Sequence, residues 1–137
     1  MAHDRLADIP EPTGRLVHDR NYSVRSYRES ETSLRIRGRV HDEKPPGLYI
    51  EHDPEPMSIH LMVVDLVVAY PSLEITDAEV VMEVTPHQGC TSIEPAYGDL
   101  VGLSIARGFS RQVRELFGGP RGCTHVGALL NLSLIHI

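Results

Sequence analysis

Two extended segments joined by a very short turn constrain the fold of this chain more than any other feature. Residues 58–70 are rich in valine and apolar on both alternating faces, as is typical of a central strand that is covered on both sides. Pro71 and Ser72 form the turn, and the pattern of residues 73–84 predicts a second strand. Its inward side chains are Ala78, Val80, Met82 and Val84, and its outward ones are Asp77, Glu79 and Glu83. The short turn predicts antiparallel neighbours.

An earlier strand carries a row of arginines. Residues 32–40 alternate cleanly, with Leu34, Ile36 and Val40 on one side and Arg35, Arg37 and Arg39 on the other. This pattern predicts a half-buried strand with one arginine-rich face, and residues 21–28 are a weaker candidate to pair with it as a hairpin. Residues 42–56 are rich in proline and acidic residues, so they are predicted to be a loop.

The second half of the chain changes to helical patterns. Residues 94–105 predict one helix, or two short ones, because glycines interrupt them. Ser110 is expected to cap a firmer helix that Gly118-Gly119 ends. A last helix begins near Cys123. The apolar residues expected inside are Val113, Leu116, Phe117, Val126, Leu129 and Leu130. Because strands come first and helices second, the predicted class is α+β, an antiparallel sheet with helices packed on one face.

The length of 137 residues fits a single domain. Residues 1–20 are predicted to be a flexible lead-in, and residues 21–131 to be the domain. Residues 132–137, Leu-Ser-Leu-Ile-His-Ile, match the translation of a transposase adapter used in sequencing libraries. We interpret them as foreign and the domain as truncated, the alternative being a genuine apolar helix end. Truncation would leave Leu129 and Leu130 more exposed than in a complete domain.

The charge of the chain is unevenly distributed. A formal net charge of −6 argues against a general nucleic-acid binder. Residues 15–39 contain seven arginines and three acids, whereas residues 42–99 contain twelve acids and one lysine. The uneven charge indicates either two solvated surfaces or a site for an anionic ligand or protein partner on Arg35, Arg37 and Arg39. A stripe of Arg107, Arg111 and Arg114 is another candidate for such a site.

The two cysteines occupy similar positions. No signal peptide or bilayer-spanning apolar run is evident, so we expect no membrane association and a reducing cytoplasm, with the cysteines as free thiols, metal ligands or nucleophiles. Cys90 and Cys123 each follow a glycine and open a predicted helix, a position that favours the thiolate. Helix starts gather at one edge of a sheet covered on one side. We therefore expect the two thiols to lie close enough to share a ligand, with Cys123 the more reactive.

Two histidines complete the predicted site. His60 lies in the central strand, as a third ligand or as a satisfied core histidine, and His125 follows Cys123 closely enough to act as a ligand or a hydrogen-bonding neighbour. The predicted metal ligands are thus Cys90, Cys123, His60 and His125, with zinc or iron as candidate cofactors. The alternative is inert core thiols. The chain has no P-loop, Gly-rich dinucleotide turn or His-Glu-x-x-His pattern.

Several short runs resemble one family. They are Gly38-Arg39-Val40, Lys44-Pro45, His60-x-Met62, Thr76-Asp77-Ala78, Leu100-Val101-Gly102-Leu103 and Arg121-Gly122-Cys123-Thr124-His125. Together, over about residues 20–131, they resemble a bacterial family known as domain of unknown function 2889. That family has no established activity, so the resemblance does not indicate one.

The order of elements also resembles NifU/IscU-type iron–sulfur scaffolds and the small metal-binding domain at the end of some ribonucleotide reductases. That likeness implies Cys90 and Cys123 in two of three cysteine positions and His60 near the third, which leaves zinc or a thiol-based site favoured. The leading hypothesis is a metal- or thiol-centred domain. A non-catalytic binding module and a structural subunit are the alternatives.

Overall fold

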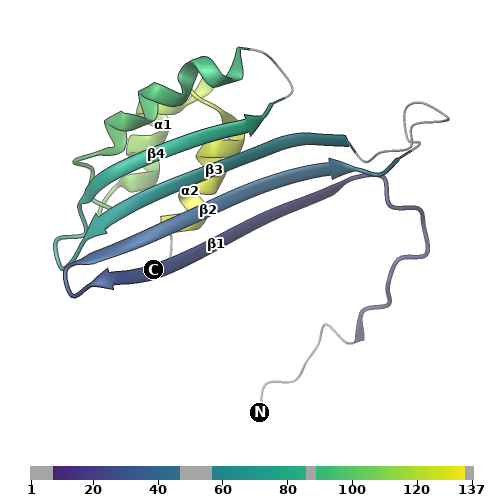
Figure 1. Cartoon of the computed structure of the whole chain (residues 1–137), viewed down its shortest axis with the longest axis horizontal. Coiled ribbons are helices and arrows are strands. Elements are labelled where there is room, and N and C mark those ends of the chain that lie inside the picture. The colour runs from purple at the N-terminus through teal and green to yellow at the C-terminus, as the bar shows by residue number, and fades with distance from the viewer. Residues whose placement is uncertain (1–7, 47–56, 86–88, 135–137) are drawn as a thin grey trace.

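The computed structural model describes residues 8–46, 57–85 and 89–134. Four strands, β1 (Asp19–Ser30), β2 (Ser33–Lys44), β3 (Met57–Ala69) and β4 (Ile75–Val84), form one antiparallel sheet in the order β1-β2-β3-β4. The helical elements follow: η2 (Cys90–Leu100), α1 (Phe109–Phe117), η3 (Gly119–Arg121) and α2 (Thr124–Leu134). They lie on one face of the sheet, which confirms the predicted α+β class (Figure 1).

Both predicted strand pairs are present. β1 and β2 form the hairpin, with Tyr27 opposite Arg35. β1 extends beyond its predicted range at both ends, and β2 extends beyond its predicted range at the C-terminal end. β3 and β4 are antiparallel neighbours, with Val64 opposite Val80. The meander follows from the short connections, since each strand can reach only the edge of the one before it.

The loop predicted over residues 42–56 begins later than expected. β2 continues to Lys44, and Asp42 is paired with His60 of β3; residues 47–56 lie outside the described part. The prediction was wrong at Asp42 because the proline-rich stretch begins only at Pro45. The alternation that buries Ile36 and Val40 therefore carries on to Asp42, which also faces the helices.

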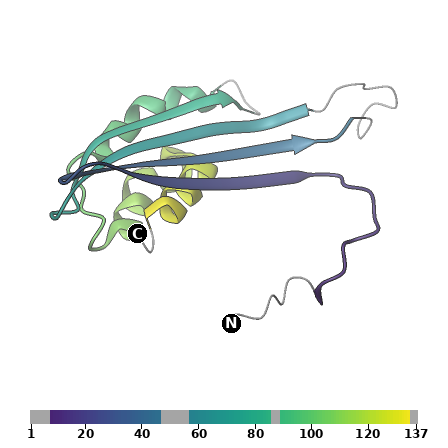
Figure 2. The same ribbon diagram turned by 60° about the horizontal axis from the view of Figure 1, so that its bottom comes forward.

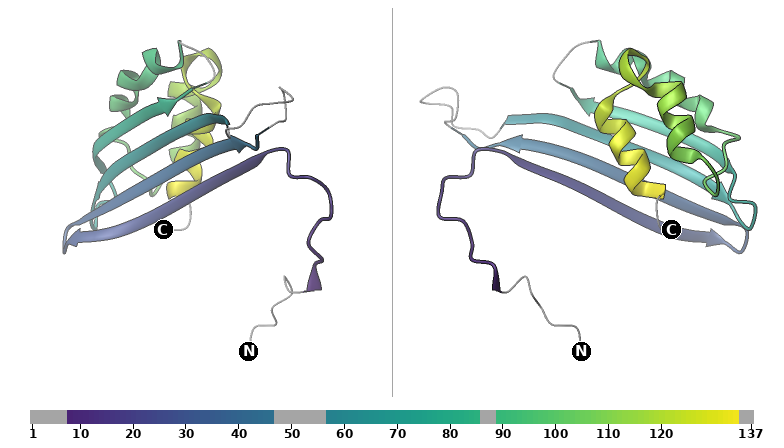
Figure 3. Two further views of the ribbon diagram at one scale, coloured as in Figure 1. Left: turned by 45° about the vertical axis from the view of Figure 1, so that its right-hand side comes forward. Right: turned by 180° about the vertical axis from the view of Figure 1, so that it is seen from behind.

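The helices cover only the inner face of the sheet, as the views in Figures 2 and 3 show from other directions. Beneath them, Val64, Leu66 and Leu129 are fully buried, and Tyr97 stacks on Phe117 with ring centres 4.5 Å apart. The expectation that β3 is covered on both faces is wrong. Its outward residues, such as Val63 and Val67, are half-buried because only the neighbouring strands shield them.

Two helix predictions need correction. The helix predicted over residues 94–105 is a 3₁₀ helix that ends at Leu100, because Gly102 has φ +94° and the chain then pairs with β4, where the Ile75 N–H donates to the Leu103 carbonyl at 2.9 Å. Ser110 does not cap α1. Gly108 with φ +65° occupies that position, and the Ser110 hydroxyl donates to Asn131 Oδ1 at 2.9 Å, tying α1 to α2. Gly118 ends α1 as predicted.

One of the residues predicted to be buried in α1 is exposed. Val113 and Phe117 are buried as expected, but Leu116 is 38% exposed. α1 has nine residues and packs against the core on a single side, so only a narrow stripe of its surface is buried. Leu116 lies outside that stripe.

The last helix packs closely against β2. A Cβ on Gly38 would lie 2.5 Å from Ser133 Oγ and 3.0 Å from Leu129, so the missing side chain lets α2 approach the sheet. Leu129 and Leu130 are 0% exposed, so the expectation that they would be unusually exposed is wrong. Residues 132–134 continue α2, and residues 135–137 lie outside the described part. The foreign origin of the last six residues stays a prediction.

Candidate metal centre

Three potential metal ligands meet on the inner face, between the sheet and α2. Asp42 comes from β2, His60 from β3 and His125 from the first turn of α2. Each offers one ligand atom, and these atoms all lie within 4.8 Å of one another. Asp42 and His60 are cross-strand partners, so their side chains point the same way, and α2 brings His125 over them.

The Asp42 carboxylate is the most tightly held group of this cluster. It is 1% exposed and accepts hydrogen bonds from Arg20 Nε at 2.7 Å, from Arg20 Nη2 at 2.9 Å and from His60 Nδ1 at 2.8 Å. Burial by itself raises the pKa of Asp42, but the hydrogen bonds from Arg20 and His60 outweigh it, and the pKa lies below its usual value. The carboxylate is therefore ionised at neutral pH.

His125 lies against His60, with ring centres 3.9 Å apart and a tilt of 32° between the rings. Burial lowers the pKa of His125, and the nearby His60 and Arg20 lower it further, against an opposing effect of Asp42. Because the neutral imidazole is favoured, its nitrogen lone pair is free for a metal ion or a proton at physiological pH.

Cys123 adds a sulfur beside this cluster. Its Sγ is 4.0 Å from His125 Nδ1 and 3.9 Å from Met62 Sδ, and its side chain is half-buried. The Cys123 backbone N–H donates to the hydroxyl of Tyr97 at 2.8 Å, which fixes the start of α2. Burial raises the pKa of Tyr97, so this hydroxyl stays protonated. The predicted neighbours Cys123, His60 and His125 are thus gathered in one place.

A shallow cleft of about 370 Å³ opens beside Asp42 and His60. It gives solvent a route toward the cluster from the end of the sheet where β2 finishes and β3 begins. His18 lies at this cleft, with its Nε2 3.9 Å from Asp42 Oδ1. The other lining residues are Val17, Arg20, Lys44 and Ile59.

Cys90 begins η2 as predicted and packs, half-buried, against the hydrophobic core. Among residues 8–46, 57–85 and 89–134, the one group of potential metal ligands contains neither Cys90 nor Cys123, so the sharing of a ligand by the two cysteines stays a prediction. Asp42, in contrast, was missed by sequence reasoning. The signal that identifies it is the inward phase of Ile36 and Val40, which places Asp42 beside His60 once β2 is extended.

The predicted arginine-rich face lies on the other side of the sheet. Asp65 accepts hydrogen bonds from Arg35 Nη1 at 2.6 Å and from Arg37 Nε at 2.7 Å, and Glu29 also pairs with Arg35. The two carboxylates raise the pKa of Arg35, the hydrogen bond to Glu29 being the largest single cause. Arg39 is exposed. The structure therefore separates the arginine face from the Asp42–His60–His125 cluster by the thickness of the sheet.

Comparisons with other proteins place the chain in one group. In the described part of the chain, no helix is long and apolar enough to cross a membrane. Neither the comparison with curated proteins nor that with solved structures found a match. The family described as protein of unknown function (DUF2889) matches residues 18–134, which include every residue of the cluster. The chain therefore belongs to the DUF2889 family.

Proposed function

We propose that this domain binds one transition-metal ion through His60, His125 and Cys123, and that Asp42 holds His60 in the binding orientation. The observation that carries the proposal is the meeting of Asp42, His60 and His125, with ligand atoms within 4.8 Å, next to the sulfur of Cys123. The residues come from β2, β3 and α2, so the fold assembles the site.

The donor set and its spacing support zinc, with iron as the second choice. Nitrogen and sulfur bound to one tetrahedral zinc ion are about 3.5 Å apart, given Zn–N and Zn–S bonds of about 2.0 and 2.3 Å. The separation of 4.0 Å between His125 Nδ1 and Cys123 Sγ is within reach of a small side-chain rotation. Three protein ligands leave a fourth position, where zinc can acidify a water molecule or hold a substrate.

The role given to Asp42 follows from its hydrogen bonds. Arg20 already occupies both carboxylate oxygens, and a guanidinium there disfavours a second cation on the same group. Asp42 instead accepts the hydrogen bond from His60 Nδ1, which fixes the ring and, in the neutral imidazole, puts the proton on Nδ1 and the lone pair on Nε2. A carboxylate behind a ligating histidine is a common arrangement in metal sites.

The test is metal binding by tag-free protein. Elemental analysis after purification, then titration with Zn²⁺ and Co²⁺, should give one equivalent bound. His125→Gln and Cys123→Ser should each weaken zinc binding by about a hundredfold or more, and Asp42→Asn by about ten- to a hundredfold. The cobalt-loaded protein should show a thiolate charge-transfer band that Cys123→Ser abolishes.

Matched controls keep this test specific. His41 lies on β2 one residue before Asp42 but on the outer face, where its Nε2 is 3.0 Å from Ser58 Oγ. His41→Gln should therefore leave affinity unchanged, and an equal loss in this variant would contradict the site. Cys90→Ser tests separately whether Cys90, the fourth predicted ligand, contributes to metal binding. Absence of stoichiometric zinc and cobalt binding would overturn the proposal.

A second candidate function is thiol chemistry without a metal. It is supported by the contact between Cys123 Sγ and His125 Nδ1 and by the position of Cys123 just before the start of α2. We also expect the cysteines to be reduced, as in a cytoplasm. Alkylation of Cys123 by iodoacetamide should then be faster than that of Cys90 in metal-free protein, and His125→Gln should slow it. Equal rates for the two thiols would remove this candidate.

A further inference from the structure

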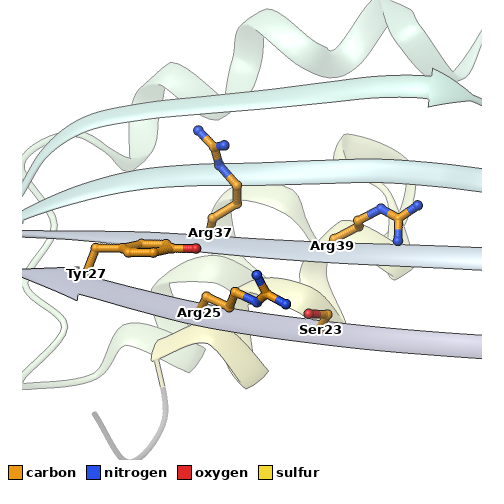
Figure 4. A pocket seen from close by; sticks show the side chains of 5 residues that line it. All are labelled: Ser23, Arg25, Tyr27, Arg37 and Arg39. Atoms are coloured by element: carbon orange, nitrogen blue, oxygen red, sulfur yellow. The ribbon is translucent and has the colours of Figure 1, made fainter.

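The outer face of the hairpin carries a basic hollow that plays no part in the proposed metal centre. It has a volume of about 340 Å³ and is lined by Ser23, Arg25 and Tyr27 of β1 and by Arg37 and Arg39 of β2. Figure 4 shows these five side chains projecting from the same side of the two strands, with the helices behind the sheet. The hollow is open to solvent on the face that no helix covers.

The strand register places like charges together in this hollow. Arg25 is directly opposite Arg37, and Ser23 is directly opposite Arg39. Like charges in opposite positions of an antiparallel pair destabilise the sheet. A bound anion would offset the repulsion between these side chains.

Of the arginines on this face, some are ion-paired within the described part of the chain and others are not. Asp65, on the neighbouring strand β3, forms ion pairs with Arg35 and Arg37. Arg25 and Arg39 are exposed, and among residues 8–46, 57–85 and 89–134 neither guanidinium has an ion-pair or hydrogen-bond partner. Two arginines with all their donors available thus flank the hollow, beside the hydroxyl groups of Ser23 and Tyr27.

We infer that this hollow binds the phosphate group of a small phosphorylated molecule between Arg25 and Arg39. A planar carboxylate is satisfied by one guanidinium fork, whereas a tetrahedral dianion can accept from two arginines on different strands and from hydroxyl groups as well. The Tyr27 ring, 46% exposed, offers a flat surface for the organic part of the ligand.

The charge of the rest of the chain limits the size of the ligand. The outer face of β4 carries Asp77, Glu79 and Glu83, all exposed, and the chain as a whole has a net charge of −6. A long polyanion crossing the sheet would meet these carboxylates. The site therefore suits a compact phosphate ester at the β1–β2 edge and not a nucleic-acid strand.

The probes are pyrophosphate and adenosine monophosphate, titrated into the full chain at low salt and followed by amide NMR shifts and calorimetry. We expect one saturable site, with shifts concentrated in β1 and β2. Arg25→Gln and Arg39→Gln should each weaken binding about tenfold or more, and Ser23→Ala several-fold.

The matched control is Arg107→Gln. Arg107 is exposed and lies on the alternative arginine stripe, so this variant removes the same charge from the other candidate surface. It should leave the dissociation constant unchanged. An equal loss in Arg107→Gln, or no saturable binding of either probe at millimolar concentration, would overturn the inference.

One further measurement separates a ligand site from an interface. If sedimentation shows a dimer that Arg25→Gln dissociates, and neither phosphate probe binds, the arginines meet the acidic face of β4 in a second copy, and the inference is wrong. A monomer that binds pyrophosphate supports it. A single-stranded oligonucleotide that binds more tightly than adenosine monophosphate would contradict the restriction to small ligands.

Discussion

The rings of His60 and His125 are in contact, with centres 3.9 Å apart, although His60 belongs to the sheet and His125 to the last helix. Two imidazoles this close repel each other when both are protonated, and Arg20 already supplies a positive charge nearby. The contact therefore favours the neutral form of His125.

The first prediction is a loss of stability in mild acid. Because the pKa of His125 is lower in the folded chain than its usual value of 6.5, the unfolded chain takes up the proton first. The free energy of unfolding should be at its full value above pH 6.5 and fall as the pH drops through the folded pKa. For one proton the slope cannot exceed about 1.4 kcal/mol per pH unit, and solvent screening reduces it.

Urea unfolding at pH 7.5 and 5.5, in wild type and His125→Gln, measures this effect. The variant should lose less stability between the two pH values. Asp42 does not affect this comparison. Its pKa is lowered in the folded chain, so its contribution to the free energy of unfolding is lost only below its usual pKa of 3.8. An identical pH dependence in both proteins would show that the ring contact does not govern acid stability.

The second prediction concerns the buried carboxylate. Asp42→Asn removes the charge that Arg20 and His60 both contact, so it should lower the free energy of unfolding by about 1–3 kcal/mol. Chemical denaturation in the presence of a chelator measures this loss without any metal contribution. Glu43→Gln is the control, since Glu43 is the next residue of β2 and its side chain is 45% exposed. Equal losses in both variants would contradict the structural role of Asp42.

The third prediction tests the close approach of α2 to β2. Gly38→Ala places a methyl group 2.5 Å from Ser133 Oγ, so it should destabilise the domain by about 1–3 kcal/mol. Gly98→Ala is the control, because no atom lies within 4 Å of its added Cβ. Thermal or chemical unfolding of the two variants makes the comparison.

A double variant sharpens this test. The Ser133 hydroxyl is buried and lacks a hydrogen-bond partner within the described part of the chain, so Ser133→Ala alone should cost little or stabilise slightly. In Gly38→Ala it should recover part of the lost stability, since it removes the atom nearest the new methyl group. Strict additivity of the two substitutions would mean that α2 shifts instead of clashing.

The fourth prediction compares the two faces of the sheet. Val64 is 0% exposed beneath the helices, so Val64→Asp places an unpaired charge in the core and should unfold the domain, at a cost of several kcal/mol or more against a total of about 5–15 kcal/mol. Val81 of β4 is 43% exposed on the outer face, and Val81→Asp should remain folded. A cooperative unfolding transition in Val64→Asp would contradict the described core.

The strand half of the fold could be predicted because β2 and β4 show their phase locally and the connections are short. Arg35 and Arg37 alternate with Ile36, and the short connection at Pro71 leaves an antiparallel pair as the natural arrangement. The helical half was harder to predict. Gly102 and Gly108 adopt positive φ angles that end or start elements, and the sequence alone does not show which glycines do so.

The candidate site could be predicted only in part. Cys123 and His125 are near in sequence, and His60 begins the central strand at the end of the sheet where the helix starts were expected to gather, so their meeting was expected. Asp42 was missed because proline at residue 45 suggested that β2 had already ended. The proximity of Cys90 rested on the general geometry of helix starts, which does not fix where a 3₁₀ helix such as η2 places its first side chain.

The close contact of α2 with the sheet has a consequence for how the domain would respond to metal. His60 and His125 belong to parts of the chain that meet only when α2 is docked, so an ion bound to both would act as a removable cross-link between the two layers. Its loss would lower the free energy of undocking α2 while leaving the strand meander intact. Hydrogen exchange in α2 would then report metal occupancy, and the domain would have a C-terminal helix whose attachment depends on the supply of metal.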